Sequence, residues 1–232
     1  MIKEGKKMES RNIKVIAHIR SDFPEKFGIP RQSGLVPNRS RIVFEPEYRD
    51  KEALRGIEGY DYLWLIWEFS EAVRDRWSPT VRPPRLGGNV RMGVFATRSP
   101  FRPNPIGLSS VRLIGIEETE DGNTLWVEGA DLMDGTPIYD IKPYVPYADS
   151  HPDARGGFSD PKAQKVQVSV PEQLLEKVPA EKREALIAVL AQDPRPSYQH
   201  DPDRVYGMSF SGMEIRFTVS EERLRVLSIE EK

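Results

Sequence analysis

An arginine-rich segment between Arg82 and Leu108 carries the residues best suited to chemistry. Between Asp75 and Glu117 the sequence contains no acidic residue and no lysine. Seven arginines stand there instead: Arg76, Arg82, Arg85, Arg91, Arg98, Arg102 and Arg112. A guanidinium binds phosphate through a planar set of donors and stacks on bases, which an ammonium group does less well. The preference for arginine over lysine therefore favours RNA as a partner.

The net charge conceals this block. The chain has a formal net charge of −2, which by itself does not indicate a nucleic-acid-binding protein. Because one short segment holds so many arginines, the rest of the chain is acidic by comparison. The residues expected to contact RNA phosphates are Arg82, Arg85, Arg91 and Arg102.

A rigid loop follows within the same segment. Three prolines, at positions 100, 103 and 105, restrict the backbone from Ser99 to Pro105. Asn104 lies between two of them, so its amide is held in a restricted direction, and that amide can pair with the edge of an adenine. Rigid loops at strand ends commonly carry functional sites. The alternative is a proline-stiffened corner of a β-sheet with no further role.

Three other short motifs combine special backbone residues with polar side chains. Pro30 pins a turn from which Arg31 and Gln32 project. The residues from Asp134 to Pro137 form an Asp-Gly turn, which a hairpin alone would explain. Beyond it come Asp140, Lys142 and Tyr144, which could equally belong to a solvated strand end.

The hydrophobic pattern that positions these motifs is mainly that of β-strands. Alternation of apolar and polar residues or β-rich composition predicts strands over 12–19, 60–69, 90–97, 106–117, 124–131 and 136–141. Residues 120–123, which include Asp121-Gly122, predict a hairpin turn, and residues 50–56 predict a short helix ending at Gly56. This run of strands favours an antiparallel β-barrel over a parallel α/β sheet.

The C-terminal part differs in pattern. Residues 144–164 form a long irregular connection rich in proline, glycine and aspartate, which is the best candidate for a domain boundary. A strand over 165–170, a helix over 180–191 and strands over 204–210, 213–219 and 224–229 are expected beyond it. The predicted fold class is mainly β, with an antiparallel β-barrel over residues 10–148 and a small α+β domain over residues 160–232.

Several classes of protein are disfavoured. The chain has no cysteine, and His18, His151 and His200 stand apart, so we expect no metal. The G-x-G-x-x-G fingerprint of dinucleotide-binding folds does not occur. No apolar run reaches the roughly 20 residues of a membrane span, and the first eleven residues lack the apolar core of a signal peptide. We therefore expect a cytoplasmic protein without a membrane partner.

Together the motifs resemble one family, the TsaA-like or TrmO-like tRNA N6-adenine methyltransferases. The matching strings occur in the family's order: residues 30–32, 82–88, 96–99, 101–107, 134–137, 140–144 and 193–196. The resemblance implies an antiparallel barrel with a small C-terminal domain, and a homodimer whose cofactor site lies near the subunit interface. It also implies a substrate, the adenine at position 37 beside the anticodon of threonine tRNA, already bearing an N6-threonylcarbamoyl group.

The resemblance implies S-adenosylmethionine as the cofactor. Its contacts would come from Pro30, Arg31, Gln32, Ser70, Glu71, Arg98, Leu108, Asp134, Gly135, Thr136 and Pro137. Ser70 and Glu71 depart from the family's pattern, in which the first residue of that pair is often histidine.

Methyl transfer from a sulfonium depends mostly on positioning, because the leaving group is neutral. The acceptor nitrogen is urea-like, so loss of its proton would help. The catalytic candidates are Asn104 to hold the base, Asp140 to accept the proton and Tyr144 to stack on the base. Lys142 or Arg195 would bind the threonyl carboxylate. Two alternatives are a non-catalytic RNA-binding barrel and a methyltransferase acting on another RNA base or on a protein.

Overall fold

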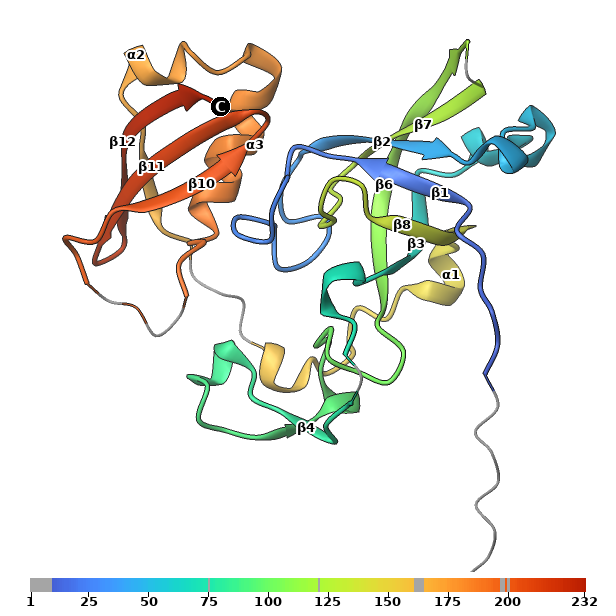
Figure 1. Ribbon diagram of the computed structural model, residues 1–232, viewed down its shortest axis with the longest axis horizontal. Coiled ribbons are helices and arrows are strands. Elements are labelled where there is room, and N and C mark those ends of the chain that lie inside the picture. Colours follow the sequence, from blue (N-terminus) through green and yellow to red (C-terminus); the bar gives the residue numbers. More distant parts are fainter. Residues whose placement is uncertain (1–9, 75, 121, 161–164, 197–198, 200) are drawn as a thin grey trace, which may run out of the picture.

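The computed structural model describes residues 10–74, 76–120, 122–160, 165–196, 199 and 201–232 (Figure 1). The start of the N-terminal segment, Asp121 of the predicted hairpin turn and His200 lie outside these ranges. None of the helices in the described ranges has the length and apolar character needed to cross a membrane.

Six antiparallel strands form the larger sheet. They are β1 (Ala17–Arg20), β2 (Arg39–Phe44), β3 (Tyr62–Glu68), β6 (Ile106–Thr119), β7 (Gly122–Glu128) and β8 (Pro137–Pro143). Their order is β1-β2-β7-β6-β3-β8, and pairing of β8 with β1 closes the ring. Buried side chains alternate along β2 and β3, which is the period-2 pattern that the sequence displays. The prediction of a mainly β, antiparallel fold is confirmed.

The segment from residue 90 to residue 97, predicted as one strand, is extended over only two residues in the structure. Only Met92–Gly93 (β5) is extended, and it pairs with Thr80–Val81 (β4) in a separate two-stranded sheet. The next residues, Val94–Ala96, turn into a 3-10 helix whose first N–H is bonded to the carbonyl of Pro79. The prediction of one continuous strand was therefore wrong, because an apolar run does not reveal where the chain will turn.

Two further boundaries differ from the prediction. The first strand begins at Ala17 and extends to Arg20, not from residue 12 to residue 19. The predicted helix over 50–56 is a single 3-10 turn, Lys51–Leu54, capped by the carboxylate of Asp50. Gly56 follows in the left-handed region at φ 86°, where glycine is favoured.

The C-terminal part forms a second sheet with helices beside it. Its elements are β9 (Gln167–Ser169), α2 (Glu172–Leu175), α3 (Ala180–Ala191), β10 (Tyr206–Phe210), β11 (Met213–Ser220) and β12 (Arg223–Glu231). The sheet order is β10-β11-β12-β9, with β9 parallel to β12 and the other pairs antiparallel. The predicted helix over 180–191 and the four predicted strands are all present.

Short helical turns complete the connections. They are η1 (Pro46–Tyr48), η2 (Lys51–Leu54), η3 (Ile57–Gly59), η4 (Ser70–Ala72), η5 (Pro84–Leu86), η6 (Val94–Ala96), α1 (Pro146–Asp149) and η7 (Gly157–Ser159). Figure 1 shows the β4 segment below the two sheets, on the same side of the molecule as the chain around residue 157.

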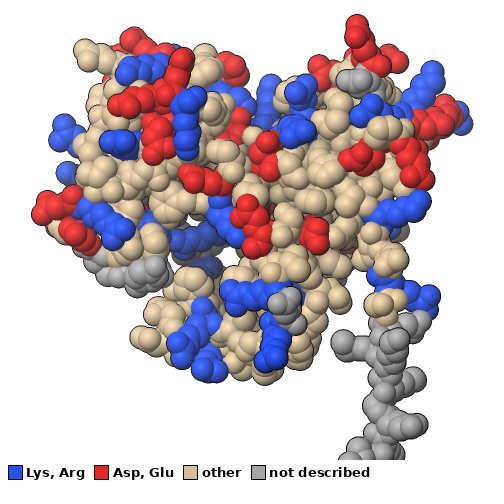
Figure 2. All heavy atoms as spheres, viewed as in Figure 1, with Lys and Arg blue, Asp and Glu red and all other residues tan. Residues whose placement is uncertain are grey.

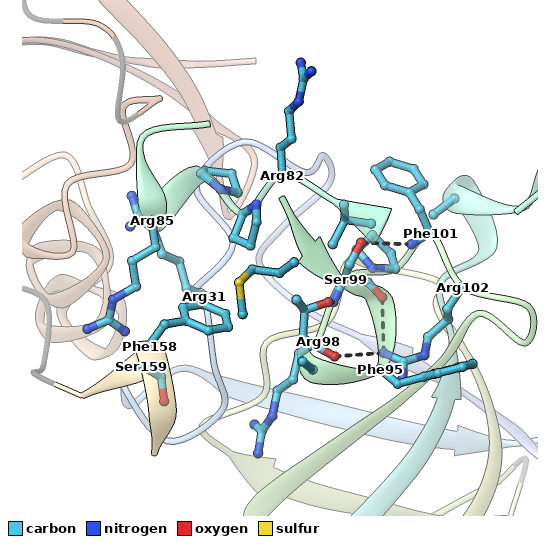
Figure 3. A pocket seen from close by; sticks show the side chains of 18 of the residues that line it. Arg31, Arg82, Arg85, Phe95, Arg98, Ser99, Phe101, Arg102, Phe158 and Ser159 are labelled. Carbon is cyan, nitrogen blue, oxygen red and sulfur yellow. Dashed lines mark hydrogen bonds between the residues drawn. The ribbon is translucent and has the colours of Figure 1, made fainter. Parts of the chain in front are cut away.

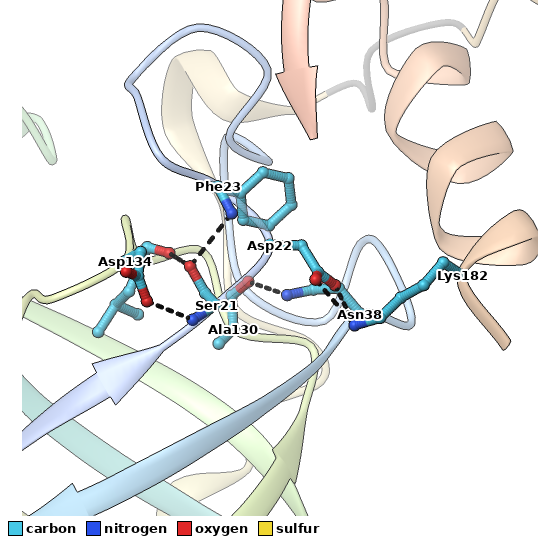
Figure 4. Close-up of polar contacts among 8 residues, drawn as sticks. Ser21, Asp22, Phe23, Asn38, Ala130, Asp134 and Lys182 are labelled. Atoms are coloured by element: carbon cyan, nitrogen blue, oxygen red, sulfur yellow. Dashed lines mark hydrogen bonds and ion pairs between the residues drawn. The ribbon is translucent and has the colours of Figure 1, made fainter. Parts of the chain in front are cut away.

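The loop after β1 connects the larger sheet to the C-terminal sheet. Phe23 and Val36 come from this loop, yet they are buried in the core of the C-terminal sheet. Asp22 forms a nearly buried ion pair with Lys182 on α3, with its Oδ2 2.6 Å from Nζ (Figure 4). Gly28 lies at φ 94° against Met208, where an added Cβ would meet Sδ at 2.3 Å. The loop is thus held on both sides, which positions the motif that follows at Pro30.

Candidate active site and nucleic-acid surface

A cavity of about 590 Å³ lies where four distant segments of the chain meet. Such a volume is typical of a pocket for a small molecule. Eight residues that were predicted to contact the cofactor line it: Pro30, Arg31, Gln32, Ser70, Glu71, Arg98, Leu108 and Thr136. Asn104, the predicted holder of the base, lines it as well. The fold therefore brings most of the predicted cofactor residues to one place, which we call the small cavity.

Side chains of two motifs are tied together at its rim. The side-chain oxygen of Gln32 accepts a hydrogen bond from the guanidinium of Arg98, and its amide donates to the carbonyl of Arg31. Arg31 in turn donates to the carbonyl of Asp193 at 3.3 Å. These contacts join the loop after β1, the arginine-rich segment and the C-terminal part.

The turn from Asp134 to Pro137 contributes only one residue to the wall of the small cavity, and its main contacts hold the loop after β1. Asp134 accepts from the backbone N–H of Ser21 at 3.0 Å, and its own N–H donates to the carbonyl of Phe23 at 2.8 Å (Figure 4). Gly135 takes φ 77°, as the turn requires. Asp134, Gly135 and Pro137 are not among the residues around the cavity, whereas Thr136 is.

A polar chain forms part of the wall of the small cavity. Trp67 donates from Nε1 to Ser109 Oγ at 2.9 Å, and Ser109 donates to Asp131 Oδ1 at 2.5 Å. Gly107 makes room for the ring of Trp67, since an added Cβ would lie 2.2 Å from Cε2. Burial raises the pKa of Asp131 above its usual value, while Ser109 and nearby Arg98 act in the opposite direction. Sequence reasoning missed Asp131, because its only signal is its place between β7 and the Asp-Gly turn.

A second cavity, of about 2230 Å³, adjoins the first and shares Arg31, Gln32 and Arg98 with it. We call it the large cavity. It is bordered by the arginine-rich segment, by residues 156–159 and by the C-terminal part (Figure 3). Five of the residues predicted to bind RNA line it: Arg82, Arg85, Arg91, Arg102 and Arg195. Figure 2 shows basic side chains concentrated on the β4 segment, with few acidic ones among them.

Some of these arginines are already engaged within the protein. Arg102 donates from one nitrogen to the carbonyls of Thr97 at 3.1 Å and Ser99 at 3.4 Å, so it holds the proline-rich loop together (Figure 3). Arg195 pairs with both carboxylate oxygens of Asp193 at 2.8 Å, and its side chain is only 10% exposed. The guanidinium groups of these two residues are held in place by the fold.

Exposed aromatic rings accompany the arginines. The rings of Trp77 and Phe95 lie 6.2 Å apart, and the two residues are 52% and 73% exposed. Phe101 carries the guanidinium of Arg74 3.6 Å from its ring centre. Exposed rings of this kind can stack on unpaired bases. Sequence reasoning missed them, although aromatic residues within an arginine block were a visible signal.

The motif on β8 lies elsewhere. Asp140 forms an ion pair with Lys142 at 2.9 Å, and Tyr144 packs against Trp64 at 5.6 Å between ring centres. Asp140, Lys142 and Tyr144 line neither of the two cavities. These three predicted residues therefore do not share a cavity with Asn104. Within the described ranges, no group of three or more histidine and carboxylate side chains is arranged to hold a metal ion.

Comparison with known families covers most of the chain. Residues 18–150 match the family described as the tRNA-methyltransferase O N-terminal domain. Residues 163–232 match the TrmO C-terminal domain.

Similar proteins extend over almost the full length. A protein of Escherichia coli (strain K12) named tRNA (adenine(37)-N6)-methyltransferase is 40% identical, over 96% of this chain and 99% of its own. A protein of Pseudomonas aeruginosa named putative S-adenosylmethionine-dependent methyltransferase RcsF is 42% identical, over 95% and 98%. A crystal structure of TrmO from P. aeruginosa superimposes with a TM-score of 0.80 at 36% identity, covering 99% of this chain and all of that one.

Proposed function

This chain belongs to the tRNA-methyltransferase O family, and we propose that it transfers a methyl group from S-adenosylmethionine to N6 of adenine 37 in a tRNA. One observation carries the proposal. Eight predicted cofactor residues from distant segments surround one small cavity, and that cavity adjoins an arginine-lined one. A methyl donor and a nucleic acid can therefore be bound side by side.

The residues of the small cavity fit S-adenosylmethionine. The cofactor carries a carboxylate and two positive charges, and the cavity offers arginine guanidinium groups as well as carboxylates. When bound, it supplies an activated methyl group on a sulfonium. Trp67 and Phe69, whose rings lie 4.2 Å apart, form an apolar wall that limits the access of water.

Asn104 is the candidate that the cavity supports for holding the adenine. Its neighbours Pro103 and Pro105 restrict its backbone, and its carbonyl accepts from the N–H of Ile106 at 2.7 Å. Its amide can accept the N6 proton in a hydrogen bond or donate to a ring nitrogen. Such positioning accounts for much of the rate of a displacement that has a good leaving group.

The large cavity is the proposed surface for the anticodon stem-loop. Arg82 and Arg85 would contact phosphates, and Trp77 and Phe95 would stack on unpaired bases. The finer substrate, N6-threonylcarbamoyladenosine of threonine tRNA, rests on the family resemblance. Its threonyl carboxylate needs a cation, and Arg31 and Arg98 are suitable because they line both cavities. Arg195 also lines the large cavity, although its guanidinium is paired with Asp193.

We also propose a homodimer in which a second copy supplies the β8 motif. Asp140 and Tyr144 do not line the small cavity of their own chain, while Leu108 on the cavity wall is 56% exposed. A partner docked beside Leu108 would bring these residues to the substrate. Mixing Asn104→Ala with Asp140→Ala chains tests this, because only a heterodimer restores one intact site. If both variants are inactive alone and no activity returns on mixing, the shared site is excluded.

The proposed reaction has a direct test. The purified protein should transfer labelled methyl groups from S-adenosylmethionine to tRNA, and nucleoside mass analysis should place the methyl on N6 of adenine 37. Modified and unmodified threonine tRNA would show whether the threonylcarbamoyl group is required. Binding of tRNA without methylation would support the alternative of a non-catalytic RNA-binding protein. Methyl transfer to another base would support the second alternative.

The division of labour and the location are proposals as well. We propose that residues 10–148 carry the reaction and residues 160–232 form a small supporting domain. Contacts such as Arg31 to the carbonyl of Asp193 support a direct role of the second part at the cavities. A tRNA-modifying enzyme of this kind would act in the cytoplasm, where its substrate is.

A further inference from the structure

The carboxylates around the small cavity differ in how their charges are balanced. Glu71 forms an ion pair with Lys26 at 3.0 Å. Glu68 accepts a hydrogen bond from the hydroxyl of Tyr139. Asp131 accepts from the hydroxyl of Ser109 and from the backbone N–H groups of Ser33 and of Asp131 itself, and among the described residues it forms no ion pair within 4 Å. Among the described residues neither Glu68 nor Asp131 therefore has a cationic partner within 4 Å, and burial disfavours the charge on Asp131.

We propose that Asp131 binds one of the two positively charged groups of S-adenosylmethionine, the sulfonium or the α-ammonium group. The inference rests on the proposed function and deepens it, because none of the sequence motifs assigns a role to Asp131. The donors to this carboxylate are the uncharged Ser109 hydroxyl and backbone N–H groups. A carboxylate that is partly withdrawn from water is stabilised further when a cation balances its charge. The ligand expected in this cavity supplies that cation.

The surroundings of Asp131 fix its direction. Ser109 lies on β6 and receives the indole N–H of Trp67 on β3, so the hydroxyl hydrogen of Ser109 is directed to the carboxylate. Trp67 is only 6% exposed, which keeps this chain of hydrogen bonds in one arrangement. The guanidinium of Arg98 lies close enough to lower the pKa of the Asp131 carboxyl by its charge. Its hydrogen bond, however, goes to the side chain of Gln32 and not to this carboxylate.

A purely structural role is the competing explanation. The backbone of Ser33 also bonds to the Asp131 carboxylate, so this residue ties the loop after β1 to β6. Loss of that tie would weaken every ligand of the small cavity, whatever its charge. Loss of a charge partner would weaken only the charged ligands. Ligand charge therefore separates the two roles.

The experiment compares three ligands on the full-length wild type and on Asp131→Asn, which keeps an acceptor for Ser109 but removes the charge. Calorimetry would use S-adenosylmethionine, S-adenosylhomocysteine, which lacks the sulfonium, and 5′-methylthioadenosine, which lacks both charges. We expect S-adenosylmethionine to bind about tenfold more weakly to the variant, with 5′-methylthioadenosine unchanged. A matching loss for S-adenosylhomocysteine assigns the ammonium, and no loss for it assigns the sulfonium.

Two results would overturn the proposal. If all three ligands weaken equally, Asp131 only holds the loop; if none weakens, it has no part in binding. Ser109→Ala is the matched control, because it removes a hydrogen bond but keeps the charge, and it should cost only about threefold for S-adenosylmethionine. Thermal melting checks that each variant is folded, and Asp131→Ser replaces Asp131→Asn if the latter does not fold. A wild type that binds no S-adenosylmethionine would instead refute the proposed function.

Discussion

The two cavities differ in how their lining side chains are held. At the small cavity Trp67, Ser109 and Asp131 form a continuous chain of hydrogen bonds, and the bonded pair Gln32 and Arg98 lies where the two cavities meet. On the β4 side of the large cavity, Trp77 and Phe95 are at least half exposed. A small rigid ligand gains affinity from a pre-organised pocket. A flexible RNA loop is better served by exposed rings and by charges that act at longer range.

The largest expected effect concerns the rate of methyl transfer, which depends on how Asn104 in the small cavity holds the acceptor base. Asn104→Ala should lower the methyl-transfer rate about 100-fold, because misplacement of the acceptor base is costly in a displacement reaction. The affinities for tRNA and S-adenosylmethionine should change little. Single-turnover kinetics with separate binding measurements would check this. An unchanged rate would show that the base is held elsewhere.

The next effect concerns the exposed rings of the large cavity. Trp77→Ala should weaken tRNA binding about tenfold, since the stacking of one base is worth roughly 1–3 kcal/mol. Binding of S-adenosylmethionine should be unaffected, because Trp77 lines only the large cavity. Fluorescence titration with an anticodon stem-loop would measure the loss, and Trp77→Phe should retain most of the affinity. A loss confined to the cofactor would reverse the assignment of the two cavities.

A smaller effect on tRNA affinity distinguishes an exposed arginine from one whose guanidinium is hydrogen-bonded within the protein. Arg82→Ala should reduce tRNA affinity a few-fold and lower the slope of log affinity against log salt by about one. Arg102→Ala should instead lower the melting temperature, because Arg102 holds the carbonyls of Thr97 and Ser99. Equal salt slopes for the wild type and Arg82→Ala would remove Arg82 from the phosphate contacts.

The smallest effect is on stability and depends on pH. Burial raises the pKa of Asp131, so between the usual carboxyl pKa and the raised one the folded chain holds a proton that the unfolded chain has released. The free energy of unfolding therefore falls as pH rises through this window. Without cofactor at neutral pH, Asp131→Asn should melt no lower than the wild type and up to about 2 °C higher. A clearly lower melting temperature at all pH values would indicate that the carboxylate stabilises the fold.

Sequence reasoning succeeded where a local rule governs the backbone. The helix over 180–191 has the predicted boundaries, because its apolar residues recur at helical spacing and bury Leu186, Val189 and Leu190. The strands β6 and β7 pair as the sequence predicts, because alternating residues flank the Asp-Gly sequence at positions 121 and 122. The strand expected over residues 90–97 failed because Val94 turns to bond with Pro79, a contact that no local pattern reveals.

Some features of the candidate site could likewise be predicted from the sequence, and others could not. Sequence alone determined that Pro30–Gln32, Arg98 and Asn104 stand on restricted loops and that one segment is strongly basic, because proline, glycine and charge act over a few residues. Only the tertiary structure decided that these loops surround one cavity, that Asp131 lines it without an ion pair among the described residues, and that Asp140 and Tyr144 do not line it. Burial and charge balance depend on segments that are distant in the chain, so they arise only when the chain is folded.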